Sequence, residues 1–195
     1  MRQIVLASTS PYRRHLLEQL QIPFVAAAPD FEEQIEQTIE APLLVQHLAL
    51  GKAQSLEAQY PDALIIGSDQ IFVDPQGQTI GKPGNQEQAF LQLQQMVGRT
   101  HTFYTGLVLF DSRTGVVSSD VATFSVTLRP LPDAQIWDYL QREQPYDCAG
   151  SFKIEGLGIA LMERMEGEDY NALIGLPLIK LVSMLAEAGV KVLGR

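Results

Sequence analysis

The sequence predicts an α/β protein with a mixed, mainly parallel twisted sheet that is flanked by helices and contains a long antiparallel hairpin. In the first half of the chain, short apolar runs such as 4–7 and 63–66 alternate with stretches whose leucines recur at helical spacing. This alternation indicates βαβ units and parallel strand pairing. Two long strand-like segments, 101–110 and 116–128, flank a polar turn at 111–115. They predict the hairpin that makes the sheet mixed.

Composition limits the class of protein before any motif is considered. The 195 residues are 46% hydrophobic and carry a formal net charge of −9. The length predicts one domain over 1–195, and the hydrophobic fraction excludes a disordered chain. A general nucleic-acid binder needs a broad basic face, and a membrane span needs ~20 apolar residues in a row. With Cys148 as its single cysteine, the chain is expected to be a cytoplasmic protein with neither nucleic acid nor membrane as a partner.

The first elements follow from caps, prolines and apolar spacing. After the strand at 4–7, Ser10 and Pro11 predict the start of a helix that Pro23 stops. A second strand is expected at 24–28. A longer helix is expected from Pro42 to about residue 60, and it carries an apolar stripe of Leu44, Leu48 and Leu56.

The later elements are read in the same way. The apolar run 63–66 is interrupted by the polar segment Gly67-Ser68-Asp69-Gln70 and resumes at 71–73. Further helices are expected at about 85–96, from a cap at Asp133 to about residue 144, and after Pro177. A glycine-bearing loop is expected at 148–158.

The start of the first helix has the residues of an anion site. Unpaired N–H groups at a helix N-terminus and its partial positive charge attract phosphate. Ser8 and Ser10 add hydroxyls, and Arg13 and Arg14 add guanidinium groups that bind phosphate oxygens in pairs. The alternative is a capped helix with solvated arginines.

Two lysines could add positive charge for the same ligand. Lys52 interrupts the apolar stripe between Leu48 and Leu56. The alternative is a packed stem whose ammonium reaches water. Lys82 lies in Gly81-Lys82-Pro83, where the proline holds it extended. Without further context it would be an ordinary loop lysine, because neither lysine belongs to a P-loop.

Asp69 is a carboxylate that directly follows a buried apolar run. We expect it near the end of a central strand, where open α/β sheets bind their ligands. There it could hold a metal or act as a general base. The alternative is a residue that caps a turn. Glu32 and Glu33 could supply a further carboxylate for Mg²⁺.

These residues occur in segments that together resemble the Maf nucleotide pyrophosphatases. The segments are Leu6-Ala7-Ser8-Thr9-Ser10-Pro11-Tyr12-Arg13-Arg14, Lys52-Ala53, Gly67-Ser68-Asp69-Gln70, Gly81-Lys82-Pro83, Cys148-Ala149-Gly150-Ser151-Phe152-Lys153-Ile154-Glu155-Gly156 and Gly175-Leu176-Pro177. The resemblance covers essentially the whole chain in order. It implies a Maf/ITPase-like fold and a metal-dependent hydrolase that cleaves a nucleoside triphosphate between its α- and β-phosphates.

The resemblance also implies roles for individual residues. Asp69 matches the proton acceptor of the family, and Glu33 matches an acidic position, so both are expected to hold a divalent cation, Mg²⁺ or Mn²⁺. The positions that match phosphate-handling residues are Ser8, Arg13, Arg14, Lys52 and Lys82. Ser10, from the anion site, is expected to join them.

Three positions indicate the branch of the family. Tyr12, Gln70 and Glu155 resemble the branch that acts on 7-methyl-GTP, although that branch usually carries Trp where this chain has Tyr12. Glu155 could accept hydrogen bonds from guanine. Tyr12 could hold the cationic base by a cation–π contact of about 0.5–2 kcal/mol. The alternatives are a dTTP/UTP pyrophosphatase or a nucleotide-binding regulator of septum formation, and pairing into a homodimer is possible by analogy.

Overall fold

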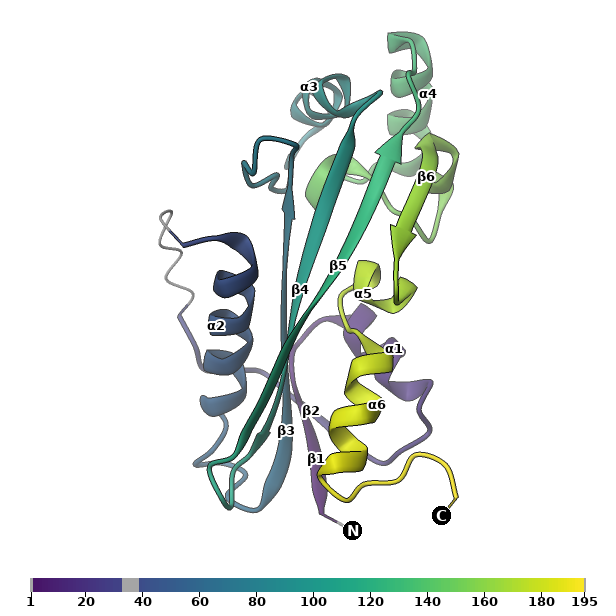
Figure 1. Cartoon of the computed structure of the whole chain (residues 1–195). Helices are drawn as coiled ribbons and strands as arrows, with labels where there is room; N and C mark the ends of the chain where they lie inside the picture. The colour runs from purple at the N-terminus through teal and green to yellow at the C-terminus, as the bar shows by residue number, and fades with distance from the viewer. Residues whose placement is uncertain (1, 33–38, 195) are drawn as a thin grey trace. The chain divides into compact units, whose positions relative to one another are not determined.

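The computed structural model describes residues 2–32 and 39–194, which form a six-stranded mixed sheet flanked by helices (Figure 1). The strand order is β2-β1-β3-β4-β5-β6. Over the described residues, no helix has the length and apolar character that a membrane span requires. The elements are β1 Gln3–Ala7, α1 Pro11–Glu18, β2 Val25–Ala27, α2 Ala41–Gln54, β3 Ala63–Val73, α3 Gln86–Met96, β4 Thr100–Asp111, β5 Val117–Leu128, α4 Asp133–Glu143, η1 Ala149–Ser151, η2 Leu157–Leu161, β6 Met162–Gly167, α5 Tyr170–Ile174 and α6 Leu178–Glu187.

The chain divides into two compact units. Unit 1 comprises Met1–Gln70, Tyr104–Thr123 and Glu168–Arg195, and unit 2 comprises Ile71–Phe103 and Phe124–Gly167. Strands β3, β4 and β5 contribute residues to both. The single domain expected over 1–195 stays a prediction.

Unit 1 is a three-layer arrangement around parallel strands. Strand β1 pairs in parallel with β2 and with β3, where Leu6 lies opposite Ile66. Because side chains alternate along a strand, each strand feeds two cores. Ile66 packs in the core on the side of α1 and α6, while Ile65 packs with Ala49 and Ala53 of α2. Figure 1 shows α2 on one side of these strands and α1 and α6 on the other.

Unit 2 has an aromatic core and an antiparallel strand pair. Phe72 stacks on Phe103 with ring centroids 4.0 Å apart, and Phe152 meets Phe72 edge-on at 5.8 Å. Strand β5 pairs antiparallel with β6. Helix α3 begins where the Asn85 side chain accepts a hydrogen bond from the Gln88 N–H at 2.9 Å, as an N-cap residue does.

Several predicted elements are confirmed. Helix α1 starts at Pro11, and the Ser10 side chain caps it by accepting from the Arg13 N–H. The two hairpin strands are β4 and β5, and α6 begins directly after Pro177. The expected fold class of a mixed α/β sheet flanked by helices is therefore correct.

Other boundaries differ from the expectation. Strand β3 does not end before the polar segment but continues through Gly67–Gln70 to Val73, because Ser68 and Asp69 find partners inside the protein. Helix α2 ends at Gln54 and is followed by turns. Asp133 is the first residue of α4, and Pro132 holds the cap position.

Strand β6 and helix α5 were not predicted from the sequence. Strand β6 reads Met-Glu-Arg-Met-Glu-Gly and is mostly exposed, so it lacks the apolar signature of a strand. Helix α5 has five residues, which is too short for a helical period to emerge.

The start of β1 is fixed to the end of β4 by a bidentate ion pair. The two terminal nitrogens of Arg2 lie 2.5 and 2.6 Å from the carboxylate oxygens of Asp111. This pairing holds the pKa of Asp111 well below its usual range. Because the folded state lowers this pKa, the pair stabilises the protein fully above about pH 4, the ordinary Asp value, and its contribution is lost as the pH falls further.

We expect Arg2→Met to lower the free energy of unfolding by about 1–2 kcal/mol at pH 7, since hydrogen bonds to charged groups are lost. The difference from wild type should shrink below about pH 4 in urea titrations. Arg142→Met is the matched control, because Arg142 pairs with Asp138 on an exposed helix surface and such pairs contribute about 0.5 kcal/mol or less. An Arg2→Met deficit that is the same at pH 2.5 and pH 7 would contradict a stabilising role of the ionised pair.

Candidate active site

The polar segment of β3 sends its side chains alternately to the two layers of unit 1. Asp69 faces α2, where it meets Lys52. Ser68 and Gln70 face the opposite layer, where they meet the segment that contains α5. The candidate site therefore has two halves, one on each face of the same strand.

The first half is a buried ion pair. The Lys52 ammonium donates a hydrogen bond to Asp69 Oδ1, and both residues are only 8% exposed. The alternative in which Lys52 reaches water is therefore wrong. Asp69 also lies inside a strand rather than at a turn, so it is not a capping residue.

Glycine brings the two partners within reach of each other. A Cβ at Gly67 would lie 2.0 Å from the carbonyl oxygen of Ala49, and one at Gly106 would lie 2.2 Å from that of Val45. Only glycine permits this approach, so α2 packs directly on the backbones of β3 and β4. Lys52 lies one helical turn after Ala49 on α2. It is therefore on the side of α2 that packs on β3, where it meets Asp69.

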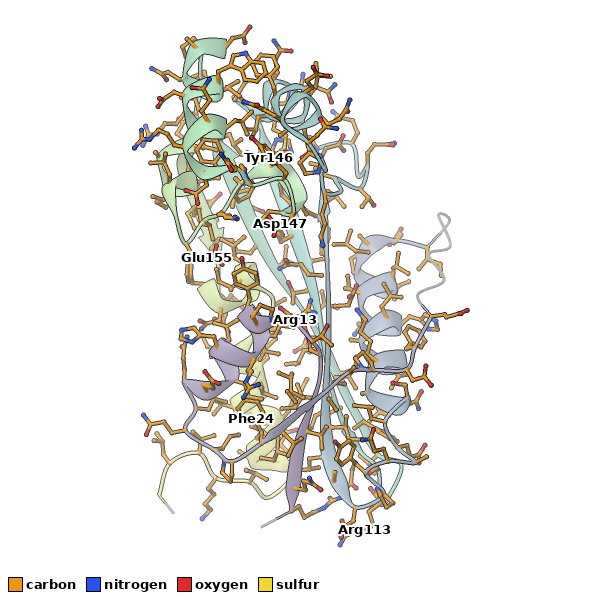
Figure 2. All side chains as sticks on the ribbon, turned by 180° about the vertical axis from the view of Figure 1, so that it is seen from behind. Arg13, Phe24, Arg113, Tyr146, Asp147 and Glu155 are labelled. Carbon is orange, nitrogen blue, oxygen red and sulfur yellow. The ribbon has the colours of Figure 1, made fainter. Side chains whose placement is uncertain are left out.

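The second half is organised around the carbonyl oxygen of Gly175. It accepts from Arg13 Nε at 2.8 Å and from the Ser68 hydroxyl at 2.9 Å. Gly175 has a φ of +124°, a conformation that favours glycine. Arg13, which Figure 2 shows on α1, is thus fixed beside β3.

The Gln70 side chain is held by the same segment, at residues that come just before Gly175 in the chain. Its Nε2 lies 2.8 Å from the carbonyl oxygen of Ala172, 3.1 Å from that of Leu173 and 2.9 Å from Thr105 Oγ1. Asp169 fixes the position of this segment, because its carboxylate accepts hydrogen bonds from the Asn171 N–H and the Ile179 N–H, both at 2.8 Å. Thr105 and Asp169 were not predicted from the sequence; a polar residue inside an apolar strand was the available signal for Thr105.

The two halves meet at a step in the sheet. Leu6 lies opposite Ile66, and β1 ends one residue later, whereas β3 continues to Val73. Beyond this point β1 no longer covers the edge of β3, and α1 begins nearby. Side chains from both faces of β3 can therefore approach one ligand at this edge.

The N-terminus of α1 is built by the two predicted serines. Ser8 Oγ accepts from the Ser10 N–H at 3.1 Å, and Ser10 Oγ accepts from the Arg13 N–H at 3.4 Å. The first turn contains no acidic residue, so nothing there opposes the partial positive charge of the helix end. Both hydroxyls keep a hydrogen that can be donated to an anion.

The other predicted residues that the structure describes lie on the surface of unit 1 or belong to unit 2. Arg14 is 64% exposed and pairs with Glu18 at 3.3 Å, as a solvated surface arginine does. Tyr12 is exposed on α1. Lys82 and Glu155, the latter labelled in Figure 2, are exposed residues of unit 2. Glu33 lies outside the described residues.

Asp69 is the carboxylate that the described part of the site offers to a cation. Among residues 2–32 and 39–194, no three His, Cys, Asp or Glu side chains form a metal-binding group. Mg²⁺ commonly takes one or two carboxylates and completes its shell with water and substrate phosphates. The single carboxylate of Asp69 fits such a minimal site.

Cys148 and His101 are packing groups rather than reactive ones. Burial raises the pKa of the Cys148 thiol to about 11, so little thiolate forms at neutral pH. His101 is buried, its Nε2 lies 2.9 Å from the Met96 carbonyl oxygen, and desolvation lowers its pKa. Neither residue therefore adds a nucleophile or a charge to the site.

Comparison with known proteins identifies the family. Residues 3–188 match the family described as Maf-like protein, and the chain belongs to this family. The 7-methyl-GTP pyrophosphatase of Syntrophotalea carbinolica is 60% identical over 194 residues, which cover 100% of this chain and 98% of that protein. Proteins of the same name from Albidiferax ferrireducens and Colwellia psychrerythraea are 47% and 49% identical, covering 99% of this chain and 96% of each relative.

The fold is also found in a distant solved structure. The Staphylococcus aureus Ham1 protein superposes with a TM-score of 0.54 at 12% identity, covering 96% of this chain and 99% of that one. The family and the fold expected from the sequence are thereby confirmed.

We expect Lys52→Met to lower the free energy of unfolding by about 3 kcal/mol, because it leaves the Asp69 carboxylate buried without its cation. Lys180→Met is the matched control in the same unit. Lys180 pairs with Asp120 at 2.7 Å, but that carboxylate is 46% exposed, so the loss should stay below about 1 kcal/mol. If chemical denaturation gives the same decrease in the free energy of unfolding for both variants, the buried pair stabilises the protein no more than the exposed pair does.

Proposed function

We propose that this protein hydrolyses 7-methyl-GTP to 7-methyl-GMP and diphosphate and so removes a modified nucleotide from the cell. The observation that carries the proposal is the buried Lys52–Asp69 pair at the step in the sheet, next to the N-terminus of α1. The names of relatives 47–60% identical over nearly the full chain support the choice of substrate.

The chemistry follows from the charges of the site. Asp69 would accept a proton from a water molecule as the water oxygen attacks the α-phosphorus, and the α–β bridging oxygen would leave with diphosphate. The Lys52 ammonium favours the ionised carboxylate, which is the form that can accept the proton. Arg13 and the hydroxyls of Ser8 and Ser10 would bind phosphate oxygens.

A divalent cation, Mg²⁺ or Mn²⁺, completes the proposal. It would be held by Asp69 and Glu33 and would neutralise charge on the phosphates as diphosphate leaves. Lys82 would add positive charge, and Tyr12, Gln70 and Glu155 would select the base. A cytoplasmic location and pairing into a homodimer stay predictions.

A panel of nucleotides tests the substrate. With Mg²⁺ or Mn²⁺ present, diphosphate release from 7-methyl-GTP should exceed that from GTP, dTTP and UTP by about tenfold or more in kcat/KM, which corresponds to one good hydrogen bond or cation–π contact. A preference for dTTP or UTP would instead assign the protein to the pyrimidine branch.

Asp69→Asn tests the general base. We expect kcat to fall by about 100-fold or more, because a positioned base contributes that much, while nucleotide binding, measured by calorimetry, persists. Asp120→Asn is the control, since Asp120 takes part in a surface pair with Lys180. If Asp69→Asn turns over at the wild-type rate, Asp69 is not the base. If such a variant lacks turnover but keeps full function in septum formation, a regulatory role is the better account.

Removal of metal tests the cofactor. Treatment with EDTA should abolish diphosphate release, and added Mg²⁺ or Mn²⁺ should restore it, because the charge on the leaving diphosphate is then neutralised again. Turnover that is unaffected by the chelator would contradict a metal-dependent reaction.

A further inference from the structure

The Gln70 side chain is oriented by the groups around its amide nitrogen. Two of the acceptors within reach of Nε2 are the backbone carbonyls of Ala172 and Leu173, at 2.8 and 3.1 Å. A carbonyl can only accept, so the nitrogen rather than the oxygen of the amide faces them. An amide nitrogen has two hydrogens, and these are taken up inside the protein by the two carbonyls and Thr105 Oγ1.

The oxygen of the same amide is left for a ligand. Within the described part of the chain, no hydrogen bond to Gln70 Oε1 is present, and the residue is partly exposed. Gln70 therefore offers an acceptor and no donor to whatever binds beside it.

Thr105 reinforces this orientation. It is fully buried, and its hydroxyl donates to the Ala172 carbonyl at 2.9 Å. Because that hydrogen is committed to a carbonyl, Oγ1 can only accept from Gln70. A flipped amide would place its oxygen against three acceptors, and Thr105 Oγ1 is the one of them that a side-chain substitution can remove.

We propose that Thr105 is a positioning residue that fixes Gln70 as a hydrogen-bond acceptor for a donor-rich base edge. The inference rests on the proposed function and extends it to a residue that does not touch substrate. The guanine edge carries adjacent N–H donors, whereas uracil and thymine carry one N–H between two carbonyl oxygens. An acceptor at Gln70 therefore favours the first class of base over the second.

The test compares kcat/KM for 7-methyl-GTP and UTP in wild type, Thr105→Val, Thr105→Ser and Thr102→Val. Valine keeps the shape but removes the hydroxyl, so the ratio for 7-methyl-GTP over UTP should fall about tenfold, the equivalent of one hydrogen bond. Thr105→Ser should restore the ratio. Thr102→Val is the matched control, because Thr102 Oγ1 lies near Ser125 Oγ at 3.4 Å and should keep both values.

The outcomes separate this proposal from the function on which it rests. A wild-type enzyme without the 7-methyl-GTP preference contradicts the proposed function. A wild-type enzyme with that preference, whose Thr105→Val variant loses activity equally on both nucleotides or keeps the ratio, contradicts the positioning role.

A second measurement needs neither a substrate nor a folded Thr105→Val variant. In ¹⁵N-labelled wild type, the Gln70 side-chain amide protons, assigned by their absence in Gln70→Glu, should exchange with solvent more slowly than those of exposed glutamines such as Gln76. Exchange as fast as that of the exposed amides would overturn the proposal.

Discussion

The hydrogen-bonded ion pair between Lys52 and Asp69 is the interaction on which the candidate site depends. It places opposite charges in a protein interior, where each would be strongly destabilising alone. Its geometry requires α2 to lie directly on β3 and β4, which Gly67 and Gly106 allow. The packing of α2 on the sheet therefore also places Lys52 beside the Asp69 carboxylate. A change that moves α2 would disturb both the packing and the ion pair.

The rest of unit 1 supports the other face of the same strand. The segment from Asp169 to Gly175 offers its carbonyl oxygens to Gln70, Ser68 and Arg13, and Asp169 holds that segment by accepting from backbone N–H groups. Since β1 stops beside Gly67, the two faces share an open edge of β3. A triphosphate bound at this edge would have the Asp69 carboxylate and the Lys52 ammonium on one side and the Arg13 guanidinium on the other.

Much of this arrangement could be predicted from local sequence. Ser10 and Pro11 predicted the start of α1, and the apolar periods predicted the hairpin, because these signals are carried by neighbouring residues. Lys52 and Asp69 were recognised as charges inside apolar patterns, but their pairing depends on residues 17 positions apart that only packing brings together. The carbonyls of α5 carried no such signal, since a backbone carbonyl has no residue type. Thr105 was visible only as a polar residue inside a strand, which does not indicate its partners. Arg14 fits the phosphate pattern in the sequence but pairs with Glu18 on the surface, because one helical turn separates those two residues.

A double-mutant cycle in turnover tests the dependence of the site on the Lys52–Asp69 pair most directly. The rates of diphosphate release from 7-methyl-GTP are compared for wild type, Lys52→Met, Asp69→Asn and the combined variant. If the two residues act as a unit, the combined variant should be about as slow as the slower single variant, because groups that work together give non-additive losses. Losses that multiply would mean that Lys52 and Asp69 act independently and would contradict a catalytic role for the pair.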